Sequence, residues 1–465
     1  LVRSAAELAA AMAQARSEAE HAFGDSRLIL ERALEGARHV EIQVFADARG
    51  NCIHLGERDC SVQRRHQKLV EESPSPAVDE GLRARMGEAA VAAARAVGYV
   101  GAGTVEFLLD GDSRFWFMEM NTRLQVEHPV TEALTGYDLV EWQLRVADGE
   151  ALPVTQQEVR YCGHAIEVRL CAEDPARDFL PQSGRVALWR PADTVRAEHA
   201  LESGGEVSPY YDPMIAKLVA HGRTRDEARE KLAAALDATV ALGLPTNKSF
   251  LAAVLRDETF ARGAATTDFL AQRRFARPEP QAADYAIAAA LLATNAGYGE
   301  WQSWSNSPAR GMHLCLDERE IALQFERGAY RAGVELRVLA IEGHEARIEL
   351  AGAEERVPFI VAEGAVHLAR GGASFSFRDH SHQPGVRRGA ALGDGRLVSP
   401  MNGRVAAVHA QAGETIATGQ ALIVLEAMKM EHGLALPAPV RVKSVHVAAG
   451  AQVSPGHLLI EFEPA

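Results

Sequence analysis

The chain has 465 residues, a hydrophobic content of 47%, a charged content of 24% and a formal net charge of −14. These values are ordinary for a soluble globular protein with about two to four domains. The acidic balance argues against a nucleic-acid binder, and no apolar run is long enough to cross a bilayer. The five cysteines include no Cys-x-x-Cys pair, which favours reduced thiols in a cytosol-like compartment.

Residues 1–272 mix predicted strands and helices without a regular βαβ rhythm, which favours an α+β domain. An amphipathic helix is predicted at 4–22, with Ser4 and Glu7 spaced as a capping box. Because nothing upstream is available to pack on this helix, we expect the chain to lack an N-terminal part. Strands are predicted at 28–32, 40–47, 104–109, 115–119 and 165–172, and further helices at 81–97, 130–148 and 225–241.

Residues 273–395 have a different character, beginning with a linker rich in Arg and Pro. An alanine-rich helix at 284–296 precedes five short strands, which predicts a small β-barrel or sandwich around one helix. We find no polar constellation here and therefore predict a docking domain. Residues 382–395, rich in Gly, Ala and Arg, are predicted to be a flexible tether. The strands are expected at 312–316, 320–326, 335–341, 346–350 and 357–361.

Residues 396–465 contain a half-repeat, which predicts two matched sets of short strands folded on each other. Lys429 lies between Met428 and Met430, at the expected turn between the halves. An ammonium at an exposed hairpin tip is suited to covalent modification by another protein. The repeat aligns Val405, Val408, His409, Gly413, Ile416, Gly419, Leu422 and Glu426 with Val442, Val445, His446, Gly450, Val453, Gly456, Leu459 and Glu463.

The strongest catalytic signal lies in residues 119–129, where polar side chains occupy every second position. In an extended chain these side chains would share one face and form the floor of an active site rather than a core. The alternative is a solvated face with incidental acids. The five residues are Glu119, Asn121, Arg123, Gln125 and Glu127.

A hairpin is predicted between residues 103–107 and Glu119, through the turn at 110–113. It would bring Glu106 near Glu119 and Asn121, and oxygen ligands at that spacing suit Mg²⁺ held jointly with substrate phosphates. The charged run at 57–68 is open to two interpretations. It is either a plain surface loop or a cation cluster that cradles phosphate and a small anion.

These segments together resemble the biotin-dependent carboxylases. The sequence Ala427-Met428-Lys429-Met430 is similar to the attachment motif of their biotin carrier domain, whereas a lipoyl domain, which is built similarly, would not be expected to carry these methionines. Residues 1–272 resemble their biotin carboxylase component, from the middle of its ATP-grasp lobe to its end. The segments that carry the second resemblance are 39–43, 57–68, 103–107, 119–129, 163–170 and 209–218.

The resemblance implies a role for each matching residue. Lys429 would carry biotin through an amide, Glu127 would be the base that deprotonates bicarbonate, and Arg169 would stabilise the biotin enolate. Lys68, Arg123, Gln125 and the backbone of Val126 would form the bicarbonate site. Glu106, Glu119 and Asn121 would bind Mg²⁺ or Mn²⁺ that bridges the ATP phosphates, and Glu31, Leu34, His39, Gln63 and His66 would line the nucleotide pocket.

Two departures from the family are visible. Arg32 stands where the family often has Lys at the adenine edge, and both residues are hydrogen-bond donors. The N-terminal domain and glycine-rich phosphate loop would precede residue 1. A chain without them should be nearly inactive.

The resemblance predicts the alpha subunit of an acyl-CoA carboxylase, with a partial ATP-grasp biotin carboxylase (1–272), a subunit-docking domain and linker (273–395) and an all-β biotin carrier (396–465). A carboxyltransferase beta subunit and a biotin protein ligase are the expected partners, in a hetero-oligomer.

The segment 399–403 favours 3-methylcrotonyl-CoA or geranyl-CoA as the substrate, with propionyl-CoA or acetyl-CoA as the alternative. A non-catalytic carrier and docking fragment, or another ATP-grasp ligase fused to a lipoyl-like carrier, are the other interpretations. We expect a bacterial cytoplasm or, as the alternative, the mitochondrial matrix.

Overall fold

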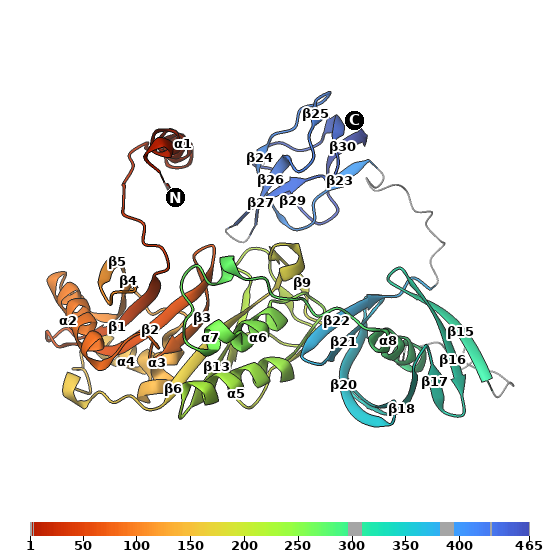
Figure 1. Cartoon of the computed structure of the whole chain (residues 1–465), viewed down its shortest axis with the longest axis horizontal. Coiled ribbons are helices and arrows are strands. Elements are labelled where there is room, and N and C mark those ends of the chain that lie inside the picture. The colour runs from red at the N-terminus through yellow and green to blue at the C-terminus, as the bar shows by residue number, and fades with distance from the viewer. Residues whose placement is uncertain (1, 3, 296–308, 382–394, 428–429, 465) are drawn as a thin grey trace.

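The computed structural model describes residues 2, 4–295, 309–381, 395–427 and 430–464 (Figure 1). The first element is α1 (Ala5–Phe23), which agrees with the predicted helix. The predicted capping box does not form, because the Ser4 hydroxyl donates to the Glu7 carboxylate (2.8 Å) instead of accepting from its N–H. The strand predicted at 28–32 is also wrong. Ile29 is 89% exposed, and none of the described strands pairs with this segment.

An antiparallel sheet of eight strands, which we call the catalytic sheet, organises residues 38–222. Its remaining predicted strands are confirmed, within a few residues at their ends. The strand order across the sheet is β11 (Arg196–His199), β13 (Met214–Gly222), β6 (His164–Cys171), β3 (Gln67–Ser73), β2 (Cys52–Arg64), β1 (Arg38–Ala46), β4 (Gly101–Leu109) and β5 (Phe115–Asn121).

Helices cover both faces of the catalytic sheet. On one face, α2 (Glu80–Ala96) packs on β1 and β2, and α5 (Arg225–Ala238) packs on β6 and β13. On the other face lie α3 (His128–Thr135) and α4 (Leu139–Ala147). The single helix predicted at 130–148 is therefore two helices. Gly136 ends the first with a left-handed backbone (φ 77°), which glycine adopts without strain.

Smaller elements complete this region. The predicted helix at 225–241 ends early, and its last residues form a short strand instead. The other elements are η1 (Gln156–Glu158), β7 (Glu173–Asp174), η2 (Pro175–Arg177), β8 (Leu180–Pro181), β9 (Gly184–Arg185), β10 (Leu188–Arg190), β12 (Glu206–Val207), β14 (Val240–Leu242), α6 (Lys248–Arg256), α7 (Glu258–Ala261) and η3 (Leu270–Gln272).

A second eight-stranded antiparallel sheet forms a meander around α8 (Ala282–Asn295), which we call the barrel. Its last strand returns to its first, because the backbones of Leu316 and Asp379 pair and the His380 N–H donates to Cys315 (2.8 Å). Of the two predicted alternatives, a barrel or a sandwich around one helix, the barrel is present, with eight strands where five were predicted. Its strands are β15 (Ala309–Leu316), β16 (Arg319–Glu326), β17 (Ala329–Arg331), β18 (Glu335–Glu342), β19 (Glu345–Leu350), β20 (Ala353–Ala362), β21 (Ala365–Arg370) and β22 (Ala373–Arg378).

The carrier region consists of two four-stranded sheets, in the orders β23-β30-β28-β25 and β27-β26-β24-β29. The predicted tether at 382–395 lies outside the described residues, except for Gly395. The strands are β23 (Arg396–Val398), β24 (Gly403–Val408), β25 (Thr415–Ile416), β26 (Ala421–Ala427), β27 (Met430–Ala435), β28 (Val440–Val445), β29 (Gln452–Val453) and β30 (Leu458–Pro464).

The half-repeat of the carrier is visible in the structure. The Gly413 N–H donates to the Val442 carbonyl (2.8 Å), and the equivalent Gly450 N–H donates to the equivalent Val405 carbonyl (2.7 Å). Each half of the carrier therefore donates a backbone hydrogen bond to a strand of the other half. Gly413 and Gly450 have φ values of 87° and 89°, a conformation that favours glycine. The turn that would hold Met428 and Lys429 lies outside the described residues, whereas Ala427 and Met430 on either side of it pair.

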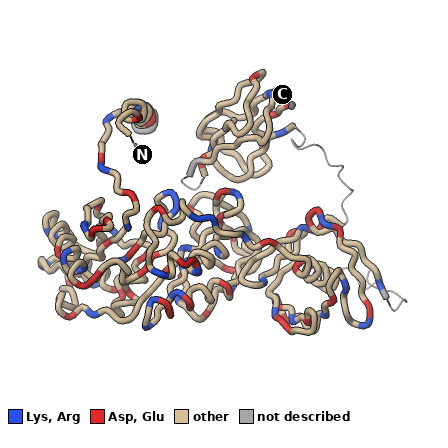
Figure 2. The backbone as a smooth tube through the Cα atoms, in the orientation of Figure 1, with Lys and Arg blue, Asp and Glu red and all other residues tan. Residues whose placement is uncertain are grey.

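The regions contact one another at defined places. The barrel packs on β14, where Val240 and Leu242 join a cluster with Ala369. The carrier touches the first region where Met401 packs near Leu180 and the Asn402 amide donates to Ser183 (3.2 Å). Figure 2 shows acidic and basic residues interleaved along all three regions. Among the described helices, none has the length and apolarity that a membrane span requires.

Candidate active site

A row of charged side chains crosses one face of the catalytic sheet. Directly paired residues point to the same face, so the strand register builds most of this row. The α3 face of the sheet carries the row. Its members, from one edge to the other, are Glu198, Lys217, Arg169, Glu167, Glu71, Arg58, Glu41, Glu106 and Glu119.

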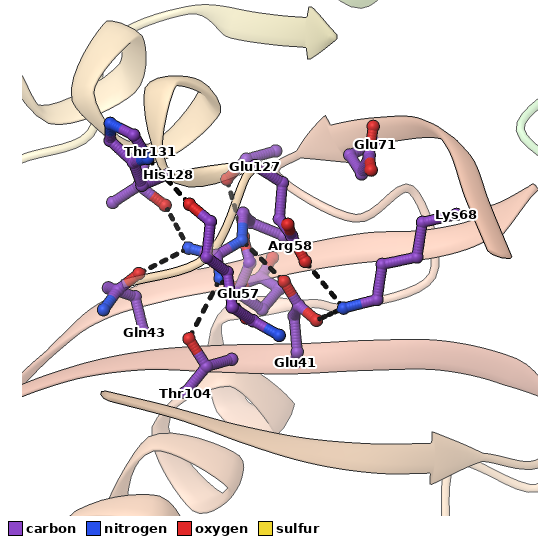
Figure 3. A network of polar contacts seen from close by, with 12 residues as sticks. Glu41, Gln43, Glu57, Arg58, Lys68, Glu71, Thr104, Glu127, His128 and Thr131 are labelled. Atoms are coloured by element: carbon purple, nitrogen blue, oxygen red, sulfur yellow. Dashed lines mark hydrogen bonds and ion pairs between the residues drawn. The ribbon is translucent and has the colours of Figure 1, made fainter. Parts of the chain in front are cut away.

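Lys68 is the cation that three carboxylates of the site share, and Figure 3 shows its side chain directed into the network. Its Nζ donates to Glu41 Oε2, to Glu106 Oε1 (2.9 Å) and to Glu127 Oε1 (2.6 Å). Burial alone would lower the pKa of Lys68, but the three carboxylates outweigh burial and raise it well above the usual lysine value. An irregularity in the β2–β3 pairing, between Val62 and Gln63, turns Lys68 toward this face.

Glu127 joins two cations that belong to different strands. Its Oε1 accepts from Lys68 on β3, and its Oε2 accepts from Arg169 Nη2 on β6 at 2.9 Å. Glu127 occupies the N-cap position of α3, is only 1% exposed and makes no capping bond. Its carboxylate is therefore held from both sides and directed into the site. A carboxylate fixed between cations can accept a proton from a bound anion.

Glu106 lies at a junction of donors. His39 Nε2 is 2.7 Å from Glu106 Oε2, and the side-chain amides of Asn121 and Gln125 donate to Glu106 Oε1 at 3.0 and 2.9 Å. Burial would raise the pKa of Glu106, but the contacts with His39 and Lys68 outweigh it and lower the pKa below the usual range. Glu106 is thus an anion at neutral pH.

The same carboxylates can hold a divalent cation. His39, Glu41 and Glu106 each offer a ligand atom within 4.8 Å of the others. Burial opposes ionisation of Glu41, yet Lys68 and Arg58 lower its pKa to about 2. Glu119 is exposed on β5 and accepts from the Asn121 amide (3.0 Å), so the three predicted metal ligands are connected. Ionised oxygen donors fit Mg²⁺ or Mn²⁺.

Arg58 lies in the middle of this network and holds several of its members in place (Figure 3). It is fully buried and donates to Glu41 Oε1 (2.7 Å), Gln43 Oε1 (2.7 Å) and Gln125 Oε1 (3.1 Å). A buried guanidinium is tolerable only when such acceptors surround it.

The charged run at 57–68 is therefore neither a surface loop nor wholly a phosphate cradle. It is a buried strand, a hairpin turn and the start of β3, and only its last residues face the cavity.

The extended conformation predicted for residues 119–127 is only half correct. The strand ends at Asn121, and the chain then bends at Arg123 and turns into α3. Gln125 and Glu127 still reach the site because the turn directs them there. Arg123 is exposed, and its Nη1 donates to the neighbouring Leu124 carbonyl (3.3 Å). The carbonyl of Val126 accepts from Lys217 Nζ at 2.6 Å.

The site opens into a cavity of about 1600 Å³. Four of the five residues predicted for the nucleotide wall line it, namely Leu34, His39, Gln63 and His66. Glu31 does not line it and is exposed, because the segment before β1 is extended and unpaired. Arg32 lines the cavity, as do Arg123 and Arg169. The predicted attachment residue, Lys429, lies outside the described residues.

Sequence reasoning missed Glu41, Arg58, Glu71 and Lys217, which hold the predicted residues in place. Glu41, Arg58 and Lys217 lie inside segments that carried the family resemblance, whereas Glu71 lies just after one of them, and none of the four received a role. The available signal was alternation: Glu41 and Gln43 alternate with the apolar residues Val40, Ile42 and Val44. Charge at every second position of a buried strand indicates a polar face that requires partners.

Comparison with known proteins gives three family matches. Residues 1–155 match the family described as carbamoyl-phosphate synthase L chain, ATP binding domain. Residues 167–272 match the biotin carboxylase C-terminal domain, and residues 395–462 match the family described as biotin-requiring enzyme.

Full-length relatives align across most of the chain. A mitochondrial methylcrotonoyl-CoA carboxylase subunit alpha of Dictyostelium discoideum is 40% identical, over 91% of this chain and 66% of that protein. A propionyl-CoA carboxylase alpha chain of Ruegeria pomeroyi is 38% identical, over 90% and 68%. The crystal structure of a Campylobacter jejuni biotin carboxylase in a beta-gamma-ATP complex has a TM-score of 0.56 and 44% identity, over 58% of this chain and 61% of that one.

The chain thus spans about two thirds of the length of the curated relatives it matches. The matched domains occur in the order expected from the three regions of the fold. The chain belongs to the family of biotin-dependent acyl-CoA carboxylase alpha subunits.

Proposed function

We propose that this chain supplies the ATP- and bicarbonate-dependent carboxylation of carrier-bound biotin in an acyl-CoA carboxylase. The observation that carries the proposal is the Lys68–Glu127–Arg169 line, in which one buried carboxylate is held between two cations. The line faces the cavity that Leu34, His39, Gln63 and His66 also border. Bicarbonate is a weak nucleophile, and cations must hold it while a base removes its proton.

Glu127 is the proposed base. It takes the proton of bicarbonate, whose oxygen then attacks the γ-phosphoryl group of ATP and forms carboxyphosphate with release of ADP. Lys68, Arg123, Gln125 and the backbone of Val126 are proposed to hold the bicarbonate. Glu106, Glu119 and Asn121, joined by Glu41, are proposed to hold Mg²⁺ or Mn²⁺, which supplies charge neutralisation at the phosphates.

Arg169 and Lys429 serve the second part of the proposed reaction. Lys429 would hold biotin, which would supply a nitrogen able to take up activated carbon dioxide. The Arg169 guanidinium, fixed by Glu71 and Glu127, is placed to stabilise negative charge that develops on an oxygen beside it. Lys429 must be modified by a biotin protein ligase for this role.

The relatives, rather than the site, support the proposed substrate and partner. Because the relatives are named as alpha subunits, a carboxyltransferase beta subunit is proposed to bind the barrel and select the acyl group. Relatives named for methylcrotonoyl-CoA and for propionyl-CoA both align, and we favour the methylcrotonoyl type. A bacterial cytoplasm stays our expectation, with the mitochondrial matrix as the alternative.

The test of the base is Glu127→Gln in the full-length subunit. The amide keeps the shape but accepts no proton, so bicarbonate-dependent ATP cleavage should fall about a hundredfold or more while ATP binding changes little. Phosphate release and nucleotide titration measure the two quantities. An unaltered cleavage rate would exclude Glu127 as the base.

The test of the carrier is Lys429→Ala. Acyl-CoA carboxylation by the complex should be abolished, whereas ATP cleavage with free biotin should continue, because only the tethered shuttle is removed. In the unaltered protein, mass spectrometry of the peptide around Lys429 measures directly which group is attached. A lipoyl mass shift, or persisting acyl-CoA turnover in the variant, would contradict the proposal. Streptavidin capture from the native source would identify the beta partner and hence the substrate class.

A further inference from the structure

Two buried glutamates lie beside Arg169. The proposed mechanism uses one of them, Glu71, only to fix the guanidinium, and it does not use the other, Glu167. Glu71 on β3 and Glu167 on β6 are direct partners in the strand register, so their side chains lie side by side on the same face. Both are 0% exposed. Among the residues that the structure describes, three of their four carboxyl oxygens have no hydrogen-bond partner: Glu71 Oε2 and both oxygens of Glu167. The fourth, Glu71 Oε1, accepts from Arg169 Nε at 2.6 Å.

Two carboxylates in this place could not both be charged without a large cost. Burial removes water, and like charges on opposed residues repel. The charged groups around the pair are Arg169 on β6, Lys217 on β13, Lys68 on β3 and Glu127 before α3. Arg169 already bonds Glu71 and Glu127, Lys68 bonds three other carboxylates, and Lys217 bonds Glu198 and the Val126 carbonyl.

We propose that Glu71 and Glu167 form a buried carboxyl pair with a single negative charge, in which Glu71 positions Arg169 and Glu167 is the uncharged acid. Glu71 fixes the Nε edge of the guanidinium, which leaves Nη2 directed at Glu127. An ionised Glu167 would add a third carboxylate around Arg169 and weaken its pull on a substrate anion. The inference rests on the proposed function only for the role of Arg169.

Burial, together with the neighbouring Glu71, raises the pKa of Glu167 well above the usual range, which agrees with the geometry. Burial also raises the pKa of Glu71, although Arg169 opposes that rise. The pair therefore titrates as a unit. One proton held by the pair would let one acid donate to an oxygen of the other, which would satisfy two of the three unpartnered oxygens.

The chain offers a matched control for Glu71 in the next residue. Glu72 is also buried and also bonded to an arginine, Arg225 (2.6 Å), but it points to the opposite face and contacts His164 (2.8 Å). In the full-length subunit, Glu71→Gln should lower kcat for carboxylation of free biotin about tenfold or more, with KM for ATP within about twofold. Glu72→Gln should destabilise the protein and leave that kcat within about twofold.

Glu167→Gln tests the charge of the second acid without relying on activity. A protonated acid and an amide are both neutral and similar in shape, so thermal stability at pH 7 to 8 should not fall. The infrared carbonyl band of a protonated carboxylic acid should be present in the unaltered protein at pH 8 and absent from this variant. A loss of stability as large as that in Glu72→Gln, or an unchanged band, would overturn the inference, as would equal kcat values for Glu71→Gln and Glu72→Gln. A failure of the proposed function would appear separately, as absent bicarbonate-dependent ATP cleavage in the unaltered protein.

Discussion

The catalytic sheet and the barrel are both antiparallel and both have eight strands, yet they bury opposite kinds of side chain. The α3 face of the catalytic sheet encloses a row of glutamates, lysines and arginines. The barrel encloses α8, where residues 286–293 are buried and all are Ala, Ile or Leu. Buried charge contributes little to stability compared with apolar packing, so its presence indicates a function. The comparison teaches that the buried polar residues, rather than the strand count, locate the active site.

The largest effect is expected from Lys68→Met. The change leaves Glu41, Glu106 and Glu127 without their shared cation, and breaking a buried pair in this way costs about 3–5 kcal/mol. Hydrogen exchange of the amides in β1 and β3 measures the local stability. ATP cleavage should be lost as well.

A barrel ion pair provides the control for that experiment. Arg331 and Glu335 form an ion pair on the outer surface of the barrel (3.1 Å), and both are about half exposed. Arg331→Ala should cost less than about 1 kcal/mol, because water screens an exposed pair. If Lys68→Met proved as mild as this control, the contrast between buried and exposed charge in this protein would be refuted.

The next effect concerns the barrel. Leu291 in α8 is 0% exposed, and Leu291→Ala should destabilise the barrel by about 2–5 kcal/mol, since it removes packed methyl groups and leaves a cavity. Exchange of the β15–β22 amides should accelerate, while bicarbonate-dependent ATP cleavage stays the same. Leu339→Ala, at a position that is 37% exposed, is the matched control. A loss of ATP cleavage in Leu291→Ala would show that the two sheets are coupled.

The smallest effect is a pH dependence in the catalytic region. Burial raises the pKa of Glu173 from its usual 4.5 to about 7, against the pull of Arg64 at 3.6 Å. The folded protein therefore binds a proton more tightly than the unfolded chain. The resulting stability is fully present below pH 4.5 and is lost as the pH rises from 4.5 to about 7, by at most about 3 kcal/mol.

Glu173→Gln should remove this part of the pH dependence. The variant's Tm should fall less than that of the unaltered protein between pH 5 and pH 8, as differential scanning calorimetry would measure. Equal slopes in the two proteins would mean that Glu173 ionises normally in the folded state.

Sequence alone determined the parts of this protein that are periodic or local. The carrier's two halves could be aligned because turn glycines such as Gly413 and Gly450 recur with the apolar residues between them. Five of the eight strands of the barrel were also predicted, whereas β17, β21 and β22 were missed. Residues of the site that lie in one short segment, such as Gln125 and Glu127, were also predicted.

Only the tertiary structure decided how distant charges meet. The strand order places β3 between β6 and β2, and a register irregularity turns Lys68 toward Glu127, so partners 59 residues apart come into contact. The same register opposes Glu71 and Glu167, which nothing local predicts. Hydrophobic periodicity specifies which residues enter the core, but a strand's neighbours are chosen by packing of the whole sheet, and that choice determines which buried charges face each other.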